Sequence, residues 1–250
     1  MKSLELLAEV RTYVFDYDGT LAPMNVDRSA SYIPQPLREV LEELAKVRKV
    51  VIATTKDCSF ILPRTPFAHA WVCSNGFEIR VKGSSYVLVP TNLFEKQQNF
   101  VEEVVEPAKK LCNELGIFLE IKRVGNLVAG ICIDWRGRYP SMPEEVRKFV
   151  DVIEGRYPVI RYVERPFVDI YIDRVDKGIA LDQLLRLGLI EKPIAYFGDS
   201  ENDVPGYQRA DVRIFVVHED NEGLDLGIEN LIRVKREELA NVLRKVLSTS

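Results

Sequence analysis

Two carboxylates stand two positions apart in the stretch YVFDYDGTLAP at residues 13–23. In an extended chain, residues i and i+2 point to the same face, so Asp16 and Asp18 would repel each other across a few ångströms. A cation between the two side chains, or a proton on one of them, would remove this repulsion. The pair therefore indicates a chemical site where a short apolar run meets a Gly-Thr turn.

Further polar side chains follow other apolar runs or begin a predicted helix. These residues are Thr54, Thr55, Asn75, Asp199, Asp203 and, at the helix start, Lys177. In open α/β sheets, ligands bind beyond the carboxyl ends of the strands. Carboxylate oxygens there suit Mg²⁺, and a lysine charge suits phosphoryl oxygens. The sequence thus predicts a magnesium site beside a phosphate site.

The residue types predict which side chains would bind the metal, which would react and which would contact the phosphate. The metal would be held by Asp16, Asp18, Asp199 and Asp203, the last either directly or through a bound water. Asp16 would remain ionised as a nucleophile that forms an aspartyl-phosphate. Asp18 would act as general acid toward the leaving oxygen and then as general base for water. The phosphate and the substrate would contact Thr54, Thr55, Asn75 and Lys177.

The elements that must position these residues alternate along the chain. Apolar runs predict strands at 12–15, 50–54, 68–75, 193–198 and 212–217. Helical spacing of apolar residues predicts helices at 34–47, 177–189 and 236–247. This order predicts an α/β fold with a mostly parallel sheet and helices on both faces.

The middle of the chain has a different pattern. Residues 82–168 combine several strand candidates with a long helix candidate at 92–115 and a second helix, which is typical of an α+β unit. We predict that this segment is an inserted domain. The core domain would then comprise residues 1–81 and 169–250.

The composition restricts the partners and the cellular location that we expect. The 250 residues are 46% hydrophobic, with 34 basic and 38 acidic side chains and no basic block, so a nucleic-acid partner is not indicated. No apolar run approaches the roughly 20 residues that cross a bilayer. The start, MKSLELLAEVR, carries acids within its apolar stretch, unlike a secretory signal. We expect a cytoplasmic protein without a membrane partner, and we make no prediction of its oligomeric state.

The four cysteines have no close spacing such as C-x-x-C. They are Cys58, Cys73, Cys112 and Cys132, each beside apolar residues. This pattern favours buried reduced thiols over disulfides or a zinc site.

The motifs carry a family resemblance. DYDGT at 16–20, Thr54, Lys177 and GDSEND at 198–203 resemble, in order and spacing, the four motifs of the haloacid dehalogenase (HAD) superfamily of phosphotransferases. The resemblance implies a Rossmann-like core, a phosphoenzyme on Asp16 and Mg²⁺ as cofactor. The insert lies between Thr54 and Lys177, which resembles the C2-type cap of sugar phosphatases.

Within the superfamily, the motifs point to phosphatases of sugar phosphates. DYDGTLAP resembles trehalose-6-phosphate phosphatases, and Glu120 and Lys122 look like the Glu-x-Lys substrate motif of their caps. GDSENDVP at 198–205 is closer to mannosyl-3-phosphoglycerate phosphatases and Cof-type sugar phosphatases. Thr54 is followed by Thr55-Lys56 and not by the Gly-Arg that is common after the corresponding hydroxyl residue in trehalose-6-phosphate phosphatases.

Each feature also has a purely structural interpretation. The D-x-D-G-T motif alone is compatible with an Asx turn after a strand, and Asn75 with an ordinary turn. Glu120 and Lys122 alternate with apolar residues, as on any solvated strand face. The two histidines, His69 and His218, are interpreted as structural. The presence of all the motifs in one order favours the catalytic interpretation.

Functions of three classes remain open: a phosphatase, a phosphosugar mutase and a catalytically silent binding module. The prediction is a Mg²⁺-dependent phosphatase for trehalose-6-phosphate or a related sugar phosphate. The enzymatic alternatives are a phosphosugar mutase resembling phosphomannomutases, which share D-x-D-G-T, and a mannosyl-3-phosphoglycerate or phosphoglycolate phosphatase. A catalytically silent binding module usually lacks the nucleophile or a metal carboxylate, and this chain keeps both.

Overall fold

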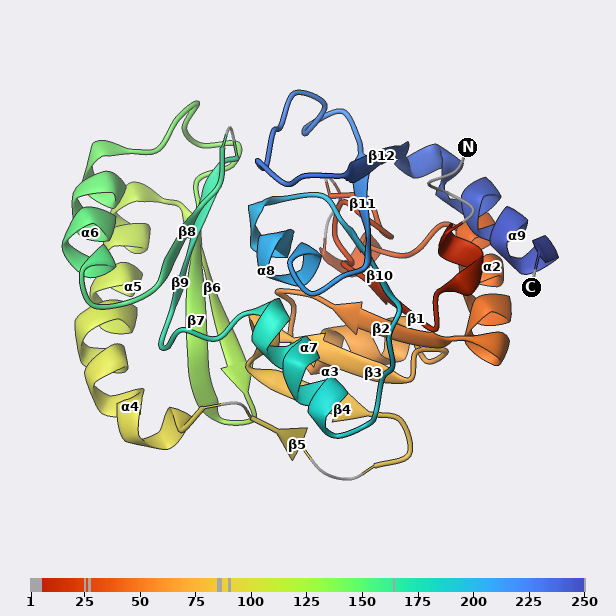
Figure 1. Cartoon of the computed structure of the whole chain (residues 1–250). Coiled ribbons are helices and arrows are strands. Elements are labelled where there is room, and N and C mark those ends of the chain that lie inside the picture. The colour runs from red at the N-terminus through yellow and green to blue at the C-terminus, as the bar shows by residue number, and fades with distance from the viewer. Residues whose placement is uncertain are drawn as a thin grey trace. The chain divides into compact units, whose positions relative to one another are not determined.

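The computed structural model describes residues 6–24, 26, 28–84, 87–89, 91–163 and 165–249. The chain forms two compact units. The core unit comprises residues 1–90 and 176–250, and the insert unit comprises residues 91–175. Both are drawn in Figure 1.

The core unit is built on an eight-stranded sheet with the order β12-β11-β10-β1-β2-β3-β4-β5. The strands are β12 (Leu231–Lys235), β11 (Val212–Val217), β10 (Ile194–Gly198), β1 (Thr12–Phe15), β2 (Lys49–Ala53), β3 (Ala70–Cys73), β4 (Glu78–Val81) and β5 (Val87–Leu88). The pairs from β12 to β3 are parallel, and β4 and β5 are antiparallel to their neighbours. The carboxyl ends of six strands therefore meet at one edge of the sheet.

Helices cover both faces of this sheet. Helices α2 (Gln35–Val47) and α9 (Leu239–Thr249) pack together on one face, and α7 (Lys177–Arg186) and α8 (Val204–Tyr207) on the other (Figure 1). The short helix α3 (Cys58–Ile61) follows β2. Successive strand residues point to opposite faces, so Phe15 packs with the α2 side and Val14 with the α7 side.

One-turn helices complete the core unit. They are η1 (Leu6–Glu9), η2 (Arg28–Ala30), η3 (Leu62–Arg64), η4 (Ser74–Gly76), η6 (Glu201–Asp203) and η7 (Arg236–Glu238).

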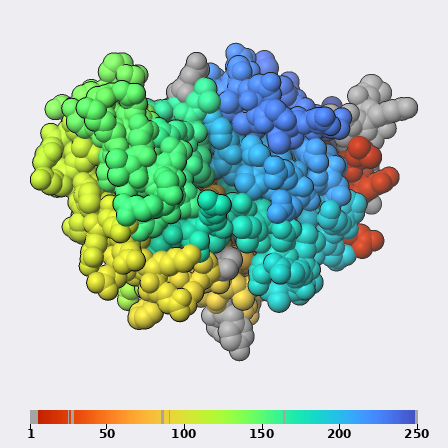
Figure 2. Space-filling view, turned by 60° about the vertical axis from the view of Figure 1, so that its left-hand side comes forward, coloured from red at the N-terminus to blue at the C-terminus, as the bar shows by residue number. Residues whose placement is uncertain are grey.

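The insert unit is a four-stranded antiparallel sheet with helices on one side (Figure 1). Its strands, in the order β6-β7-β9-β8, are β6 (Phe118–Val124), β7 (Leu127–Asp134), β9 (Phe167–Tyr171) and β8 (Val159–Arg161). Its helices are α4 (Leu93–Phe100), α5 (Glu106–Leu115) and α6 (Glu144–Glu154), with a π-helical turn, η5 (Val101–Val105), between α4 and α5. Figure 2 shows the outer surface of these helices in yellow and green.

The predicted fold class, a parallel α/β core with an α+β insert, is confirmed. The unit boundaries lie further along the chain than expected. Strand β5 pairs with β4 in the core sheet, and β9 pairs with β7 in the insert sheet. Within the segment predicted as the insert, the apolar run SYVLVP at 85–90 is a strand candidate, and its residues Ser85, Tyr86 and Pro90 lie outside the described residues. Among the residues described, no helix combines the length and apolarity that crossing a membrane requires.

The prediction of four reduced cysteines is wrong for two of them. Cys58 and Cys73 form a disulfide, whereas Cys112 and Cys132 are free and buried. Strands β2 and β3 are parallel neighbours, so Cys58, at the start of the helix after β2, comes within a Cα–Cα distance of 5.3 Å of Cys73 at the end of β3. Spacing along the sequence does not reveal this proximity.

Candidate active site

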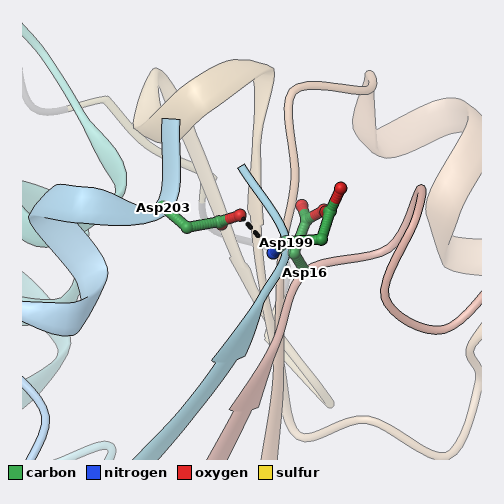
Figure 3. A group of neighbouring side chains, drawn as sticks. All are labelled: Asp16, Asp199 and Asp203. Atoms are coloured by element: carbon green, nitrogen blue, oxygen red, sulfur yellow. Dashed lines mark hydrogen bonds between the residues drawn. The ribbon is translucent and has the colours of Figure 1, made fainter. Parts of the chain in front are cut away.

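Two acids meet because their strands are parallel neighbours. In the sheet Phe15 of β1 is opposite Phe197 of β10, and the chain places Asp16 and Asp199 just beyond these residues. Figure 3 shows both side chains at the strand ends, with Asp203 reaching them from the helical turn that follows β10. All three carboxylates are buried, and one oxygen from each lies within 4.8 Å of the others.

Asp203 organises the turn after β10. Its Oδ2 accepts hydrogen bonds from the backbone N–H groups of Asp199, at 3.0 Å, and Ser200, at 3.1 Å (Figure 3). Its Oδ1 accepts from the Tyr196 hydroxyl and the Lys177 ammonium, each at 2.7 Å. A carboxylate has about four acceptor positions, so protein donors occupy the acceptor capacity of Asp203.

Lys177 is fully buried at the first position of α7. Its Nζ donates to Asp16 Oδ1 at 2.8 Å, to Asp203 Oδ1 at 2.7 Å and to Asn202 Oδ1 at 3.1 Å, which accounts for all three ammonium hydrogens. Burial would lower the pKa of Lys177, but the carboxylates of Asp16 and Asp203 raise it above its ordinary value. The lysine therefore stays charged although the helix dipole disfavours a cation at this end.

The charges of the cluster do not balance. Three buried carboxylates, Asp16, Asp199 and Asp203, face one ammonium, which leaves a net charge of −2 when all are ionised. Burial raises the pKa of Asp16 well above its ordinary value; Asp203 and Asp199 act in the same direction, and Lys177 opposes them. One divalent cation would neutralise the cluster, and grouped carboxylate oxygens are the hard ligands that Mg²⁺ prefers. The residues present thus fit a magnesium ion.

Asp18 lies in the tight turn after β1 and does not join this group of three carboxylates. Its Oδ1 accepts a hydrogen bond from the Ser31 hydroxyl at 3.3 Å, and its Oδ2 lies 3.7 Å from Lys56 Nζ. The turn depends on Gly19, whose φ is +84°. A Cβ on Gly19 would lie 2.4 Å from Asp199 Oδ2, so only glycine allows the two strand ends to approach this closely.

The loops after β2 and β3 bring Thr54 and Asn75 together. The Asn75 N–H donates to the Thr54 carbonyl at 2.9 Å, and Thr54 Oγ1 accepts from the Lys56 N–H at 3.1 Å. Asn75 is buried with φ +59°, and its Oδ1 has no hydrogen-bond partner within the part of the chain that the structure describes. A buried acceptor left unpaired is costly, so this amide is available to a ligand. Thr55 follows Thr54 directly and is half-buried.

The loop after β3 also contacts the start of α7. A Cβ on Gly76, whose φ is +107°, would lie 2.4 Å from the Asp176 carbonyl oxygen and 3.4 Å from the Lys177 nitrogen. Glycine is therefore required at this contact. It brings Asn75 and Thr54 to the same end of the sheet as the carboxylates.

Comparisons with known proteins agree with this geometry. Residues 14–207 match the sequence model of the trehalose-phosphatase family. The chain belongs to this family. A phosphoglycolate phosphatase of Saccharolobus solfataricus is 25% identical over 206 residues, which cover 81% of this chain and 78% of that protein. The predicted enzyme class, a HAD-type phosphatase, is confirmed.

Solved structures share the fold. The C-terminal domain of trehalose-6-phosphate phosphatase from C. albicans superposes with a TM-score of 0.77 at 14% identity, covering 100% of this chain and 97% of that chain. A phosphatase of the HAD enzyme superfamily from Bacteroides thetaiotaomicron superposes with a TM-score of 0.67 at 14% identity, covering 96% and 95%.

The two residues with the trehalose-phosphatase Glu-x-Lys spacing lie on β6 of the insert unit. Lys122 is buried, and its Nζ lies 3.2 Å from Asp169 Oδ1 on β9. Glu120 is half-buried on the same strand face. Burial would lower the pKa of Lys122, but Asp169 and Glu120 raise it above its ordinary value. Lys122 is thus a buried cation that Asp169 neutralises.

Three further residues contact the site, and the sequence analysis assigned none of them a role there. Asn202 contacts Lys177, Tyr196 contacts Asp203, and His218 contacts Asp199. Asn202 lies inside the quoted GDSEND motif, and His218 follows the predicted strand at 212–217. The rule that ligands gather at carboxyl ends of strands identifies His218 when it is applied to that strand too.

Proposed function

We propose that this chain is a Mg²⁺-dependent phosphomonoester hydrolase that acts on a sugar phosphate through an aspartyl-phosphate on Asp16. One observation carries the proposal: a buried group of three carboxylates and one lysine with a net charge of −2 at the carboxyl ends of β1 and β10. Bound Mg²⁺ would neutralise these carboxylates and draw negative charge from the phosphoryl oxygens. Asp16 and Asp199 would hold it, and Asp203, whose acceptor positions are filled by protein donors, would add its negative charge and fix Lys177 and the turn that carries Asp199.

Asp16 and Asp18 would carry the two half-reactions. An oxygen of Asp16 attacks phosphorus, the bond from phosphorus to the sugar oxygen breaks, and Asp18 gives its proton to that oxygen. Asp18 then takes a proton from water as the water oxygen attacks phosphorus. The bond to Asp16 breaks, inorganic phosphate leaves, and both acids return to their starting states. The partial exposure of Asp18 suits a group that must exchange protons with substrate and water.

The phosphate would be held by side chains from two loops and a helix start. Lys177 fixes Asp16 and supplies positive charge at the reacting centre. The unpaired Oδ1 of Asn75 accepts a hydrogen bond from a substrate hydroxyl, while the hydroxyls of Thr54 and Thr55 donate to phosphoryl oxygens.

The insert unit would select the sugar. Its candidate recognition cluster is defined as Glu120, Lys122 and Asp169, and it carries one positive charge against two negative charges. Of the three, Glu120 is partly exposed and offers acceptors to sugar hydroxyls, and the net negative charge of the cluster repels a second anionic group on the substrate. The cluster therefore favours a sugar phosphate over phosphoglycolate, the substrate in the name of the Saccharolobus solfataricus relative.

The test is phosphate release from a substrate panel with Mg²⁺ and with EDTA. The panel contains trehalose-6-phosphate, hexose phosphates, mannosyl-3-phosphoglycerate and phosphoglycolate. We expect Mg²⁺-dependent release that is fastest from a sugar phosphate without a carboxylate. A preference for phosphoglycolate would support that alternative, and return of phosphate to another position of the same sugar would indicate a mutase. Activity that survives complete removal of metal would contradict the proposal.

A further inference from the structure

His218 lies at the carboxyl end of β11, next to Asp199 of the carboxylate cluster. Its side chain is 2% exposed, and its Nε2 lies 3.1 Å from Asp199 Oδ2. Its contact with Asp199 is what requires an explanation.

The surroundings of the ring assign its tautomer. The backbone N–H of Asp220 donates to His218 Nδ1 at 3.3 Å, which makes Nδ1 an acceptor in the neutral ring, and the Asp220 carboxylate Oδ2 lies 3.7 Å from the same nitrogen. In the neutral ring the proton then resides on Nε2, which donates to Asp199 Oδ2. The histidine thus presents an N–H group to the carboxylate.

Asn221 holds this arrangement in place. Its Oδ1 accepts from the His218 backbone N–H at 2.8 Å, and its Nδ2 donates to the carbonyls of Asp199 and Val216, both at 2.9 Å. The side chain is buried. One amide therefore fixes the ends of β10 and β11 relative to each other, and with them His218 relative to Asp199.

The second oxygen of Asp199 is fixed as well, because Thr20 Oγ1 donates to Oδ1 at 3.4 Å. With a donor on each oxygen, the plane of the carboxylate is set. Hydrogen bonds of this kind orient ligating groups, and their loss typically costs 10–100-fold in metal affinity.

We propose that His218 is a positioning residue that holds the Asp199 carboxylate in the orientation that binds Mg²⁺. This inference rests on the proposed function, which places Mg²⁺ at Asp16 and Asp199. It assigns His218 no contact with the metal or the substrate.

The test is the dissociation constant of Mg²⁺ for the substrate-free enzyme, measured by calorimetry. His218→Leu keeps a similar volume and removes the donor, and we expect its Mg²⁺ Kd to rise by about 10–100-fold. His218→Gln places an amide N–H three bonds from Cβ, as Nε2 is in histidine, and should recover most of the affinity. His69→Leu removes the other histidine, which bonds the backbone of Val50, and should leave the Kd unchanged.

The outcomes are distinct. Equal Mg²⁺ affinity of His218→Leu and wild type overturns the positioning role and leaves the proposed function intact. Wild-type enzyme that binds no Mg²⁺ overturns both. If His218→Leu does not fold, ¹⁵N NMR of the wild-type ring decides: a proton on Nε2 in the Mg²⁺-bound enzyme supports the proposal, and a proton on Nδ1 alone overturns it.

Discussion

Asp16 is the residue whose charge its neighbours control most strongly. It is buried beside two carboxylates and one ammonium, so its charge depends on these neighbours and would depend on a bound cation. Asp16→Asn replaces the carboxylate with a neutral amide, which cannot attack phosphorus and binds a cation weakly. We expect loss of turnover with every phosphomonoester. Initial rates measure this effect, and thermal unfolding checks that the variant is folded; wild-type rates in a verified variant would exclude Asp16 as nucleophile.

The raised pKa of Asp16 makes the stability of the metal-free protein depend on pH. Because the folded-state pKa lies above the unfolded value of 3.8, the contribution of Asp16 is fully present below pH 3.8 and is lost as the pH rises through the folded-state pKa. Relative to Asp16→Asn, the wild type should therefore lose up to about 1.4 kcal/mol per pH unit within this window.

Urea unfolding of both EDTA-treated proteins between pH 4 and 8 measures this difference. We expect Mg²⁺ to reduce the loss in the wild type, because the cation favours the ionised carboxylate. A difference in unfolding free energy between the two proteins that does not change with pH would show that the pKa of Asp16 is not raised in the folded protein.

Residue types and spacing predicted Asp16, Lys177, Asp199 and Asp203 because each follows an apolar strand or begins a helix in the sequence. Their contact depends on the parallel pairing of β1 with β10. In this pairing Thr12 lies opposite Ile194, which is 182 positions later in the sequence. His218 was interpreted as structural because a single histidine carries no motif.

At the level of elements, strand β12 and the disulfide could not be predicted from the local sequence pattern. The segment LIRVK of β12 has an arginine between its apolar residues and a lysine at its end, and pairing with β11 is what makes it a strand. The disulfide likewise depends on β2 lying beside β3. Both features arise from neighbours that are distant in sequence, whereas α2, with four buried apolar residues at helical spacing, was predicted correctly.

The disulfide joins the first residue of α3, which follows the loop with Thr54, to the last residue of β3, which precedes the loop with Asn75. It closes a loop with a sequence separation of 15 residues, for which the chain-entropy model gives about 3 kcal/mol of stabilisation. We expect Cys58→Ala/Cys73→Ala to lower the free energy of unfolding by about this amount in urea titrations. Cys112→Ala changes a free buried cysteine and is the control. Because this variant keeps the disulfide, a reductant should lower its free energy of unfolding as much as that of the wild type. An unfolding free energy that does not differ between the double variant and the oxidised wild type would show that the disulfide does not stabilise the fold.

At the scale of the whole molecule, catalysis and selection are expected to belong to different units. The carboxylate cluster lies in the core unit, and the Lys122–Asp169 pair lies in the insert unit. Lys122→Met removes the buried cation of the recognition cluster and should lower kcat/KM for the best sugar phosphate at least about tenfold, or 1.4 kcal/mol. Hydrolysis of a small aryl phosphate should change little.

Lys109→Met provides the matched control on the same unit, since Lys109 is an exposed lysine paired with Glu106 on helix α5. It should leave both substrates unaffected. Equal losses of sugar-phosphate and aryl-phosphate hydrolysis in Lys122→Met would mean that Lys122 supports the fold or the chemistry rather than the choice of sugar.

The central claim is that phosphate passes through Asp16, and chemical trapping tests it most directly. The enzyme is mixed with Mg²⁺ and a phosphorylated sugar, quenched in acid during turnover, and mapped by peptide mass spectrometry. The structure leads us to expect a phosphoryl group on the peptide that contains Asp16, which is buried and held by Lys177 at 2.8 Å. Phosphate on a different residue, or rapid turnover with no phosphoenzyme under conditions that preserve an acyl phosphate, would contradict it.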